Sequence, residues 1–285
     1  LLMDRSERNL NGKSSVDQIG RLLRYGRRSR IKSGMTTKRD NRRKPKFKYP
    51  LPMFTKTAKH YDAVYSDKDY GAESDQLTVL VRERVPGAKT LLDVACGTGG
   101  HLEYLVGRSG FDCTGVDLDG EILEIARERL PSATLHKGDM RNFALDTRFD
   151  VVACLFSSIG YTKTVESMNR AVANMAAHVR AGGLLIVEPW ITPEAWLVGH
   201  AHSETVETDD FVVTRMMVAE PVERGRVVFE YLIGDSSGIS RVSETHEMGW
   251  FTHLEYISAF KKAGLKTEHI QPGITDRGLY VGRKS

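Results

Sequence analysis

An acidic residue and two glycines lie close together where an apolar run of the sequence ends, in the stretch Thr90–Gly100 (TLLDVACGTGG). The apolar residues suit a strand that is buried on both faces. Because glycine has no Cβ, Gly97 and Gly99 allow a tight turn and a close approach of the backbone to a ligand. A strand that passes through such a turn into a helix predicts a loop that binds a nucleotide-like cofactor.

The loop departs from the dinucleotide-binding fingerprint G-x-G-x-x-G, because Leu102 stands where the third glycine would be. The remaining pattern, Asp93-x-Ala95-x-Gly97-x-Gly99, resembles motif I of class I S-adenosylmethionine-dependent methyltransferases. S-adenosyl-L-methionine carries no phosphate, so it needs a close backbone and scattered polar groups instead of a phosphate cradle. The alternative is a glycine turn in an α/β protein of another class.

An acid that holds the ribose hydroxyls is expected about 20 residues beyond such a loop, at the end of the next strand. Asp117, in CTGVDLD, occupies that place. Asp139 and Met140, in HKGDM, follow the third expected strand, where class I methyltransferases hold the adenine. A carboxylate can accept from the exocyclic amine and a thioether can lie along the ring. An ordinary turn with a capping aspartate is the alternative for this pair.

The elements that position these residues alternate regularly between strands and helices. This alternation predicts an α/β fold, a doubly wound, mostly parallel seven-stranded Rossmann-like sheet that binds ligands beyond the carboxyl ends of its strands. The expected strands are Thr90–Ala95, Asp112–Asp117, Ala133–Lys137, Phe149–Cys154 and Gly183–Glu188, and the expected helices are Ala72–Val85, Gly100–Ser109, Gly120–Leu130 and Thr164–Val179.

The chain changes character after the fifth strand. Thr205–Glu244 contains β-rich segments separated by turns, which predict an antiparallel excursion that roofs the pocket. A helix over Thr252–Ala263 and strands over Leu265–Ile270 and Gly278–Gly282 then complete the sheet. The expected organisation is a basic extension over 1–52, the first part of a cofactor-binding domain over 53–190, the excursion over 191–250 and the completing elements over 251–285.

The net charge of +4 conceals a division between the extension and the rest of the chain. Leu1–Pro50 carries 16 Lys and Arg against 4 Asp and Glu, a charge of +12, so the remainder carries −8. We expect this segment to be disordered. It suits either an arm for nucleic acid or a dispensable extension upstream of a start at Met53, and the second is favoured because no aromatic platform accompanies the charge.

Other features narrow the class of protein. Cys96, Cys113 and Cys154 show neither metal spacing nor a disulfide framework, so we expect a reducing cytoplasm and no metal. No membrane-spanning run or signal peptide is expected. Methyltransferases that modify base amines carry an Asn/Asp-Pro-Pro-aromatic segment after the fourth strand. This chain has Leu155–Tyr161 (LFSSIGY) there instead, which argues against nucleic acid as the acceptor.

Several side chains near the expected pocket have two interpretations. Trp190 suits either a pocket wall or plain core, and Tyr61 either a ring facing a sulfonium cation or part of a lid helix. Arg215 and Arg277 could be substrate contacts or surface charges. His178, His246 and His253 have no ligand spacing and are expected to be structural or solvated.

Five segments, LLDVACGTG, HKGDMRNF, LFSSIGY, VEPW and DRGLYVG, together resemble the bacterial N,N-dimethyltransferases that act on dTDP-3-amino-3,6-dideoxyhexoses. The likeness runs from about Phe54 to Gly282. It implies that S-adenosyl-L-methionine contacts Tyr61, Ala95, Asp117, Asp139, Met140 and Leu155, together with the glycine loop. It implies substrate contacts from Phe54, Trp190, Ile191, Thr192, Pro193, Glu194, Arg215 and Arg277, the last toward the nucleotide diphosphate.

The resemblance implies transfer of one or two methyl groups to the amine of a dTDP-linked amino sugar, by an enzyme that forms a homodimer. Orientation of the reactants can contribute about 7–11 kcal/mol, and a general base about 10²–10⁴-fold, so positioning is expected to dominate. Some members of the family have histidine where this chain has Tyr161, which is the candidate to hydrogen-bond the amine or pass on its proton. The alternatives are another small amine or hydroxyl acceptor, or a nucleic-acid-associated protein that uses the basic extension.

Overall fold

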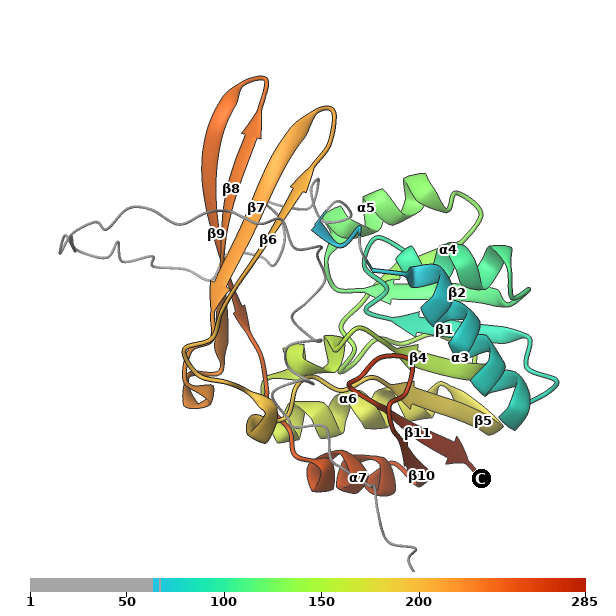
Figure 1. The fold of residues 1–285 in the computed structure, drawn as a ribbon. Coiled ribbons are helices and arrows are strands. Elements are labelled where there is room, and N and C mark those ends of the chain that lie inside the picture. Colours follow the sequence, from blue (N-terminus) through green and yellow to red (C-terminus); the bar gives the residue numbers. More distant parts are fainter. Residues whose placement is uncertain (1–63, 67) are drawn as a thin grey trace, which may run out of the picture.

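The computed structural model describes residues 64–66 and 68–285. The basic extension, Phe54 and Tyr61 lie outside these residues. Seven strands form one sheet in the order β10-β11-β5-β4-β1-β2-β3 (Figure 1). Their bounds are β1 (Thr90–Val94), β2 (Asp112–Asp117), β3 (Thr134–Lys137), β4 (Phe149–Cys154), β5 (Val179–Val187), β10 (Leu265–Ile270) and β11 (Leu279–Lys284). Strand β11 runs antiparallel to both of its neighbours, β10 and β5, whereas β1 to β5 pair in parallel and therefore end at one common edge.

Helices cover both faces of this sheet and form two separate cores. The helices are α3 (Tyr70–Arg84), α4 (Gly100–Gly107), α5 (Gly120–Arg129), α6 (Val165–Ala177) and α7 (His253–Lys262). Leu91 and Val151 pack with apolar residues of α3, α4 and α5, whereas Leu92 and Val152 pack with those of α6 and α7. Successive strand residues thus face opposite cores, as expected for strands buried on both faces.

Helix starts coincide with residues that the sequence marks for capping. Thr252 begins α7 with a complete capping box, in which its side chain and Glu255 satisfy each other's backbone N–H groups. Asp119 and Thr164 cap α5 and α6 through their side chains. Gly99 precedes α4 in a left-handed conformation (φ +81°), which glycine adopts without strain.

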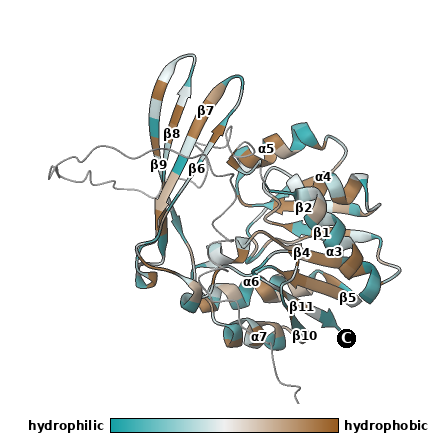
Figure 2. Cartoon of the chain, in the orientation of Figure 1, coloured by the Kyte–Doolittle hydropathy of each residue, from teal (hydrophilic) through white to brown (hydrophobic). Residues whose placement is uncertain are grey.

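A second, antiparallel sheet is inserted between β5 and α7 and stands beside the central sheet (Figure 1). Its strands pair in sequence order: β6 (Ala201–Glu207), β7 (Phe211–Val218), β8 (Arg226–Asp235) and β9 (Gly238–Glu247). Figure 2 shows hydrophobic residues concentrated in the central strands β1, β4 and β5, while the second sheet mixes hydrophobic and hydrophilic positions. In the part of the chain that the structure describes, no helix is long and apolar enough to cross a membrane.

The structure confirms the predicted fold class and the order of elements, with two local differences. Strand β5 begins at Val179 and not at Gly183, because Val179 already pairs with Phe149 ahead of an irregularity in the ladder. The excursion is also longer than Thr205–Glu244, since β6 begins at Ala201 and β9 continues to Glu247. The second difference places His246 within a strand of the sheet.

Candidate active site

The glycine loop after β1 forms the tight turn that its sequence predicts. Ala95, Gly97 and Gly99 all have positive φ (63°, 57° and 81°). A Cβ added at Gly97 would meet no atom within 4 Å, so the loop backbone borders open space at that residue. This is the arrangement that a ligand lying against the main chain requires.

Asp117, at the end of β2, is held against this loop. One carboxylate oxygen accepts the backbone N–H of Gly97 and the other that of Asp119, each at 2.9 Å. Burial raises the pKa of Asp117, and the two backbone donors offset part of that effect. Each oxygen retains a lone pair, so the carboxylate is fixed in orientation and can still accept hydrogen bonds from a diol.

Asp93, in β1 just before the loop, is a buried acid without a hydrogen bond to one of its oxygens. The residue is 2 % exposed, and no described residue hydrogen-bonds its Oδ2. Burial, together with the smaller effect of the Asp117 negative charge, raises the pKa of Asp93 to about 8. A ligand that brings a cationic or donor group to this oxygen would remove the deficit.

A small hollow lies at the edge where β1 and β4 end, and the predicted contacts Gly99, Asp117, Asp139 and Met140 are not among the residues that line it. Its lining includes the predicted contacts Ala95, Gly97 and Leu155. It also includes residues that the sequence analysis did not select: Tyr70, Asp93, Cys96, Thr98, Gly100, His101, Phe156 and Ser158. Open backbone at Gly97, a fixed acid and an unsatisfied buried carboxyl fit the ribose and the cationic amino-acid end of S-adenosylmethionine, so the residues present suit that cofactor.

A buried ion network lies against one wall of the hollow. Lys68 forms an ion pair with Glu73, whose carboxylate also bonds His101 Nε2 at 2.9 Å. Burial lowers the pKa of Lys68, which the neighbouring carboxylate only partly offsets. The ammonium lies 4.2 Å from the centre of the Phe156 ring and 5.0 Å from that of Tyr70. The segment before α3 is thereby tied to the loop after β4.

The loop after β4 turns sharply, with Phe156 and Ser157 at positive φ (51° and 63°). Non-glycine residues hold this conformation only where surrounding contacts enforce it. Glu188, at the end of β5 and fully buried, accepts the Phe156 N–H at 2.6 Å, and the Ser157 hydroxyl donates to the Pro189 carbonyl at 2.9 Å. The strained turn is therefore anchored to the neighbouring strand.

Arg277 lies at the same edge and is not a surface charge. Its guanidinium is 11 % exposed and donates to Glu188 at 2.9 Å, while Thr275 donates to the same carboxylate oxygen. Its Nε has no partner among the described residues. Arg277 can present this one N–H to a ligand, but Glu188 already balances its charge.

Asp139 and Met140 follow β3 next to Asp117, since the Gly138 N–H donates to the Asp117 carbonyl at 2.8 Å. The Asp139 carboxylate accepts the Arg141 guanidinium, with Nε to Oδ1 at 2.8 Å. This hydrogen bond is the main reason that the pKa of Asp139 is lowered. Met140 is partly buried against the α6 side of the core. The Asp139 carboxylate is therefore ionised and forms an ion pair with Arg141.

The segment after β5 forms an apolar wall between the two sheets. Ile191 is buried and joins Trp196, Met217, Val227 and Met248 in one cluster, against which Trp190 and Tyr161 pack. Thr192 and Pro193 are partly buried and Glu194 is exposed. The Trp190 indole N–H is buried without a partner among the described residues. The aromatic wall suits a ligand with a hydrogen-bond acceptor, because the Trp190 N–H could donate to that acceptor.

Tyr161, in the short 3-10 helix η1 (Ser158–Thr162), faces the second sheet. Its hydroxyl lies 2.9 Å from Nδ1 of His246 in β9. Burial raises the pKa of Tyr161 well above its usual range, and neighbouring acidic groups, Asp117 among them, act in the same direction. His246 is 3 % exposed, so it is not solvated.

Arg215, in β7, is enclosed by an acid and two rings. It donates to Glu204 at 2.6 Å, and its guanidinium lies 4.8 Å from the Tyr65 ring centre and 5.3 Å from that of Phe229. The side chain is 11 % exposed, which excludes a surface charge. The structure does not bring Arg215 into the hollow beside the glycine loop.

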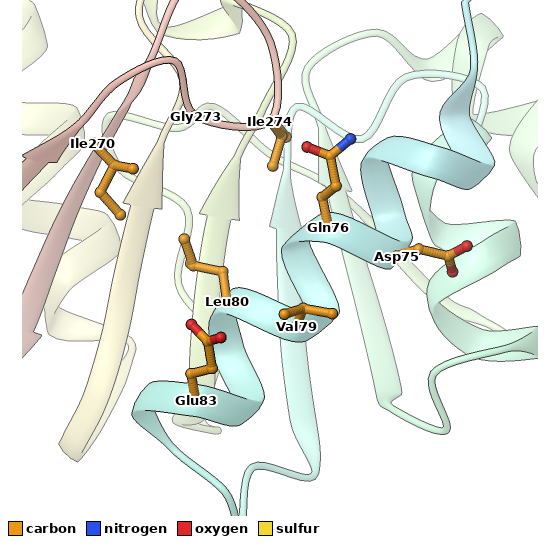
Figure 3. A pocket seen from close by; sticks show the side chains of 8 residues that line it. All are labelled: Asp75, Gln76, Val79, Leu80, Glu83, Ile270, Gly273 and Ile274. Atoms are coloured by element: carbon orange, nitrogen blue, oxygen red, sulfur yellow. The ribbon is translucent and has the colours of Figure 1, made fainter.

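A wider, shallower groove lies elsewhere, between α3 and the turn after β10. Figure 3 shows side chains of α3, Leu80 and Gln76 among them, on one side and Ile270 and Ile274 on the other. None of its lining residues belongs to the predicted site or to the hollow. Its open, largely apolar lining offers no set of convergent polar groups.

The fold and this edge of the sheet define a class I methyltransferase, and comparison with known proteins agrees. A family described as a methyltransferase domain matches residues 91–183. The dTDP-3-amino-3,4,6-trideoxy-alpha-D-glucopyranose N,N-dimethyltransferase of Streptomyces venezuelae is 42% identical over 78% of this chain and 95% of its own length. The dTDP-3-amino-3,6-dideoxy-alpha-D-glucopyranose N,N-dimethyltransferase of Streptomyces fradiae is also 42% identical, over 79% of this chain and 89% of its own length.

Solved structures give the same result. The crystal structure of DesVI from Streptomyces venezuelae aligns with a TM-score of 0.75 and 41% identity, covering 80% of this chain and 98% of that one. CalS10, an amino pentose methyltransferase of Micromonospora echinaspora solved with bound SAM, aligns with a TM-score of 0.72 and 37% identity, covering 79% and 96%. The chain belongs to the family of dTDP-amino sugar N,N-dimethyltransferases, as its sequence motifs predicted.

Proposed function

We propose that this protein transfers methyl groups from S-adenosyl-L-methionine to the amine of a dTDP-linked 3-amino-3,6-dideoxyhexose. The observation that carries the proposal is the identity of 42% across 89% of a relative named as the N,N-dimethyltransferase of dTDP-3-amino-3,6-dideoxy-alpha-D-glucopyranose. Family membership confirms the enzyme class and the cofactor predicted from the sequence. The particular sugar and the addition of two methyl groups instead of one are part of the proposal.

Bound S-adenosylmethionine supplies an electrophilic methyl group and a neutral thioether leaving group. The chain would hold it through the backbone of Ala95, Gly97 and Gly99, with Asp117 oriented by Gly97 and Asp119 to receive the ribose hydroxyls. As the family resemblance implies, Asp139, Met140 and Leu155 would border the adenine end. Asp93, which lines the hollow and has a carboxylate oxygen without a partner among the described residues, would face the cationic amino-acid end. Tyr61 and Phe54 stay predicted contacts outside the described residues.

On the acceptor side, the wall formed by Trp190, Ile191, Thr192, Pro193 and Glu194 would orient the sugar. The unused N–H groups of Trp190 and Arg277 are its most direct donors. Arg215 would reach the nucleotide only if its pairing with Glu204 were shared with the diphosphate. Positioning of a neutral amine in line with the methyl–sulfur bond is the main contribution expected from these residues.

The decisive experiment measures the mass of candidate acceptors after incubation with labelled S-adenosylmethionine. The panel contains the dTDP-3-amino sugar, the free amino sugar, a dTDP sugar with its amine elsewhere, and an unrelated small amine. We expect two methyl groups on the first compound and little transfer to the others. Equal transfer with and without the nucleotide would contradict the amino-sugar assignment and favour another small-molecule acceptor.

The cellular setting and assembly are proposals of the same kind. A cytoplasmic setting is consistent with the free, buried cysteines Cys96, Cys113 and Cys154, and the homodimer is proposed from the family resemblance. Light scattering of the purified protein tests the dimer. We propose a division into 1–52, 53–190, 191–250 and 251–285. The antiparallel sheet inserted between β5 and α7 supports the boundaries near residues 190 and 250, and limited proteolysis tests all three. Deletion of residues 1–52 should leave methyl transfer intact, and loss of nucleic-acid binding in that variant would give the extension a separate role.

A further inference from the structure

His246 and Glu244, both in strand β9 of the antiparallel sheet, extend the contacts of Tyr161 in sequence. The Tyr161 hydroxyl lies 2.9 Å from Nδ1 of His246, and Nε2 of the same ring lies 3.6 Å from a carboxylate oxygen of Glu244. Residues 244 and 246 share one face of β9 because side chains alternate along a strand. The tyrosine comes from η1, which follows strand β4 of the central sheet, so these contacts join the central part of the fold to the antiparallel sheet.

The contact between the layers is fixed by close backbone packing. The Gly249 N–H donates to the Gly160 carbonyl at 2.7 Å, directly after β9 and within η1. A Cβ at Gly160 would lie 2.6 Å from Met248 and 3.3 Å from Trp190, so only glycine allows this approach. Tyr161 is the next residue, and its orientation toward His246 follows from this packing.

The surroundings of the histidine contain few other charges. Its side chain is 4% exposed and that of Glu244 is 9% exposed. The Phe229 ring, from β8, packs edge-on against the imidazole, with 5.1 Å between the two ring centres. The guanidinium of Arg215, from β7, lies over the ring of Phe229. Tyr161 from η1 faces Nδ1 of the ring, and Glu244 from β9 itself faces Nε2.

The tautomer follows from the chemistry of the neighbours. Because burial keeps the Tyr161 phenol protonated, its O–H donates to Nδ1, and the imidazole proton then resides on Nε2. That Nε2–H points toward a carboxylate, which stabilises the ring when Nδ1 also takes a proton. Tyr161 is therefore the hydrogen-bond donor, His246 the acceptor, and Glu244 the negative charge beside the imidazole.

We propose that His246, backed by Glu244, accepts through Tyr161 the proton released at each methyl transfer. This inference rests on the proposed function. Attack by the neutral amine forms an N–C bond, breaks the C–S bond and leaves one excess proton on the product nitrogen. That proton passes to the Tyr161 oxygen as the phenol proton passes to Nδ1, and it returns by the same route to water once the product has left.

The relay resolves a difficulty of Tyr161 acting alone. A phenol whose pKa is raised cannot keep a proton that it accepts unless it gives up its own at the same time. The histidine supplies the site for that second proton. Tyr161 is then the group that touches the amine, and His246 acts through it as a positioning and proton-accepting residue.

The test uses the full-length enzyme with the dTDP-3-amino sugar and the variants His246→Asn, Tyr161→Phe and the double variant. Asparagine at 246 can still accept the tyrosine hydrogen bond but cannot hold a proton. We expect kcat to fall about 10²-fold in His246→Asn, the lower end of general-base effects, with the KM values of both substrates changed less than about threefold. The acid-side decline of kcat with pH should disappear.

Two comparisons separate a relay from a structural contact. In a relay, kcat falls by about the same factor in each single variant and in the double variant. If the two substitutions acted independently on the structure, their factors in kcat would multiply in the double variant. His253→Asn is the matched control, because His253 Nδ1 also bonds a tyrosine hydroxyl, that of Tyr280 at 3.0 Å, away from the cofactor loop. This control should leave the pH profile of kcat unchanged.

Each outcome decides the proposal. A wild-type enzyme that methylates the sugar and a His246→Asn variant with the same kcat and pH profile would overturn the relay and leave the proposed function standing. If His246→Asn does not fold, Tyr161→Phe carries the test, since it removes a single oxygen, and an unchanged kcat there overturns the relay. A wild-type protein that transfers no methyl group overturns the proposed function and the relay together.

Discussion

Asp93→Asn should change the way in which folding stability depends on pH. The folded state raises the pKa of this carboxyl from 3.8 to about 8, mainly because the group is buried. In the unfolded chain Asp93 is ionised above about pH 4, and on folding it takes up a proton. The free energy of unfolding contributed by this group is therefore greatest at low pH and is lost as the pH rises toward 8.

The magnitude follows from the size of the shift. Between about pH 5 and about pH 7 one bound proton corresponds to a fall of about 1.4 kcal/mol in the free energy of unfolding for each pH unit. Removing the carboxyl should make the slope of stability against pH more positive by this amount. A buried amide has its own desolvation cost of about 1–3 kcal/mol, but this cost does not depend on pH and cancels from the slope.

Urea unfolding followed by circular dichroism, at several pH values in this range, measures the two slopes. Asp112→Asn, which alters an exposed aspartate on the neighbouring strand β2, is the matched control and should leave the slope close to that of the wild type. Parallel stability curves for Asp93→Asn and the wild type would refute the idea that Asp93 is held neutral in the folded protein.

The cofactor provides a second measurement on the same group. A cationic ligand beside Asp93 favours the ionised carboxylate, so binding of S-adenosylmethionine near pH 7 should release up to one proton from the wild type and none from Asp93→Asn. Calorimetric titrations in two buffers with different ionisation enthalpies give this number directly. Equal proton release by both proteins would place the charged end of the cofactor away from Asp93.

Other predictions concern the glycine loop and the ion pair at the end of β5. Gly97→Ala and Gly99→Ala should each lower the free energy of unfolding by about 1–3 kcal/mol, because both positions have positive φ. Calorimetry should show a much larger loss of cofactor affinity for Gly97→Ala than for Gly99→Ala. The reason is that the Cβ added at Gly97 enters open space, whereas the Cβ added at Gly99 meets Leu130. Glu188→Gln should lower the free energy of unfolding by about 3–5 kcal/mol because it leaves the Arg277 charge buried and uncompensated. Adding Arg277→Met should restore part of that loss in urea unfolding, and a double variant less stable than Glu188→Gln would contradict this explanation.

The sequence alone determined the architecture and the position of the cofactor loop. Local patterns contain this information, because the apolar runs before Asp93 and Asp117 and the glycines between them act through neighbouring residues in the chain. The motif LFSSIGY likewise placed Tyr161 at the carboxyl end of a strand. The alternation of β9 could have placed Glu244 and His246 on one face, had the strand been extended beyond residue 244.

Tertiary structure decided which of these groups meet. Tyr161 and His246 are 85 positions apart, and Arg277 and Glu188 are 89 apart, so no local pattern predicts either contact. The arginines predicted as substrate contacts, Arg215 and Arg277, proved to be enclosed with carboxylates, because a guanidinium is buried only with a compensating charge. Packing of the antiparallel sheet against η1 brings Tyr161 and His246 together, whereas Arg277 meets Glu188 because β11 pairs with β5 and Arg215 meets Glu204 because β7 pairs with β6. Each of these contacts depends on segments that are distant in the sequence.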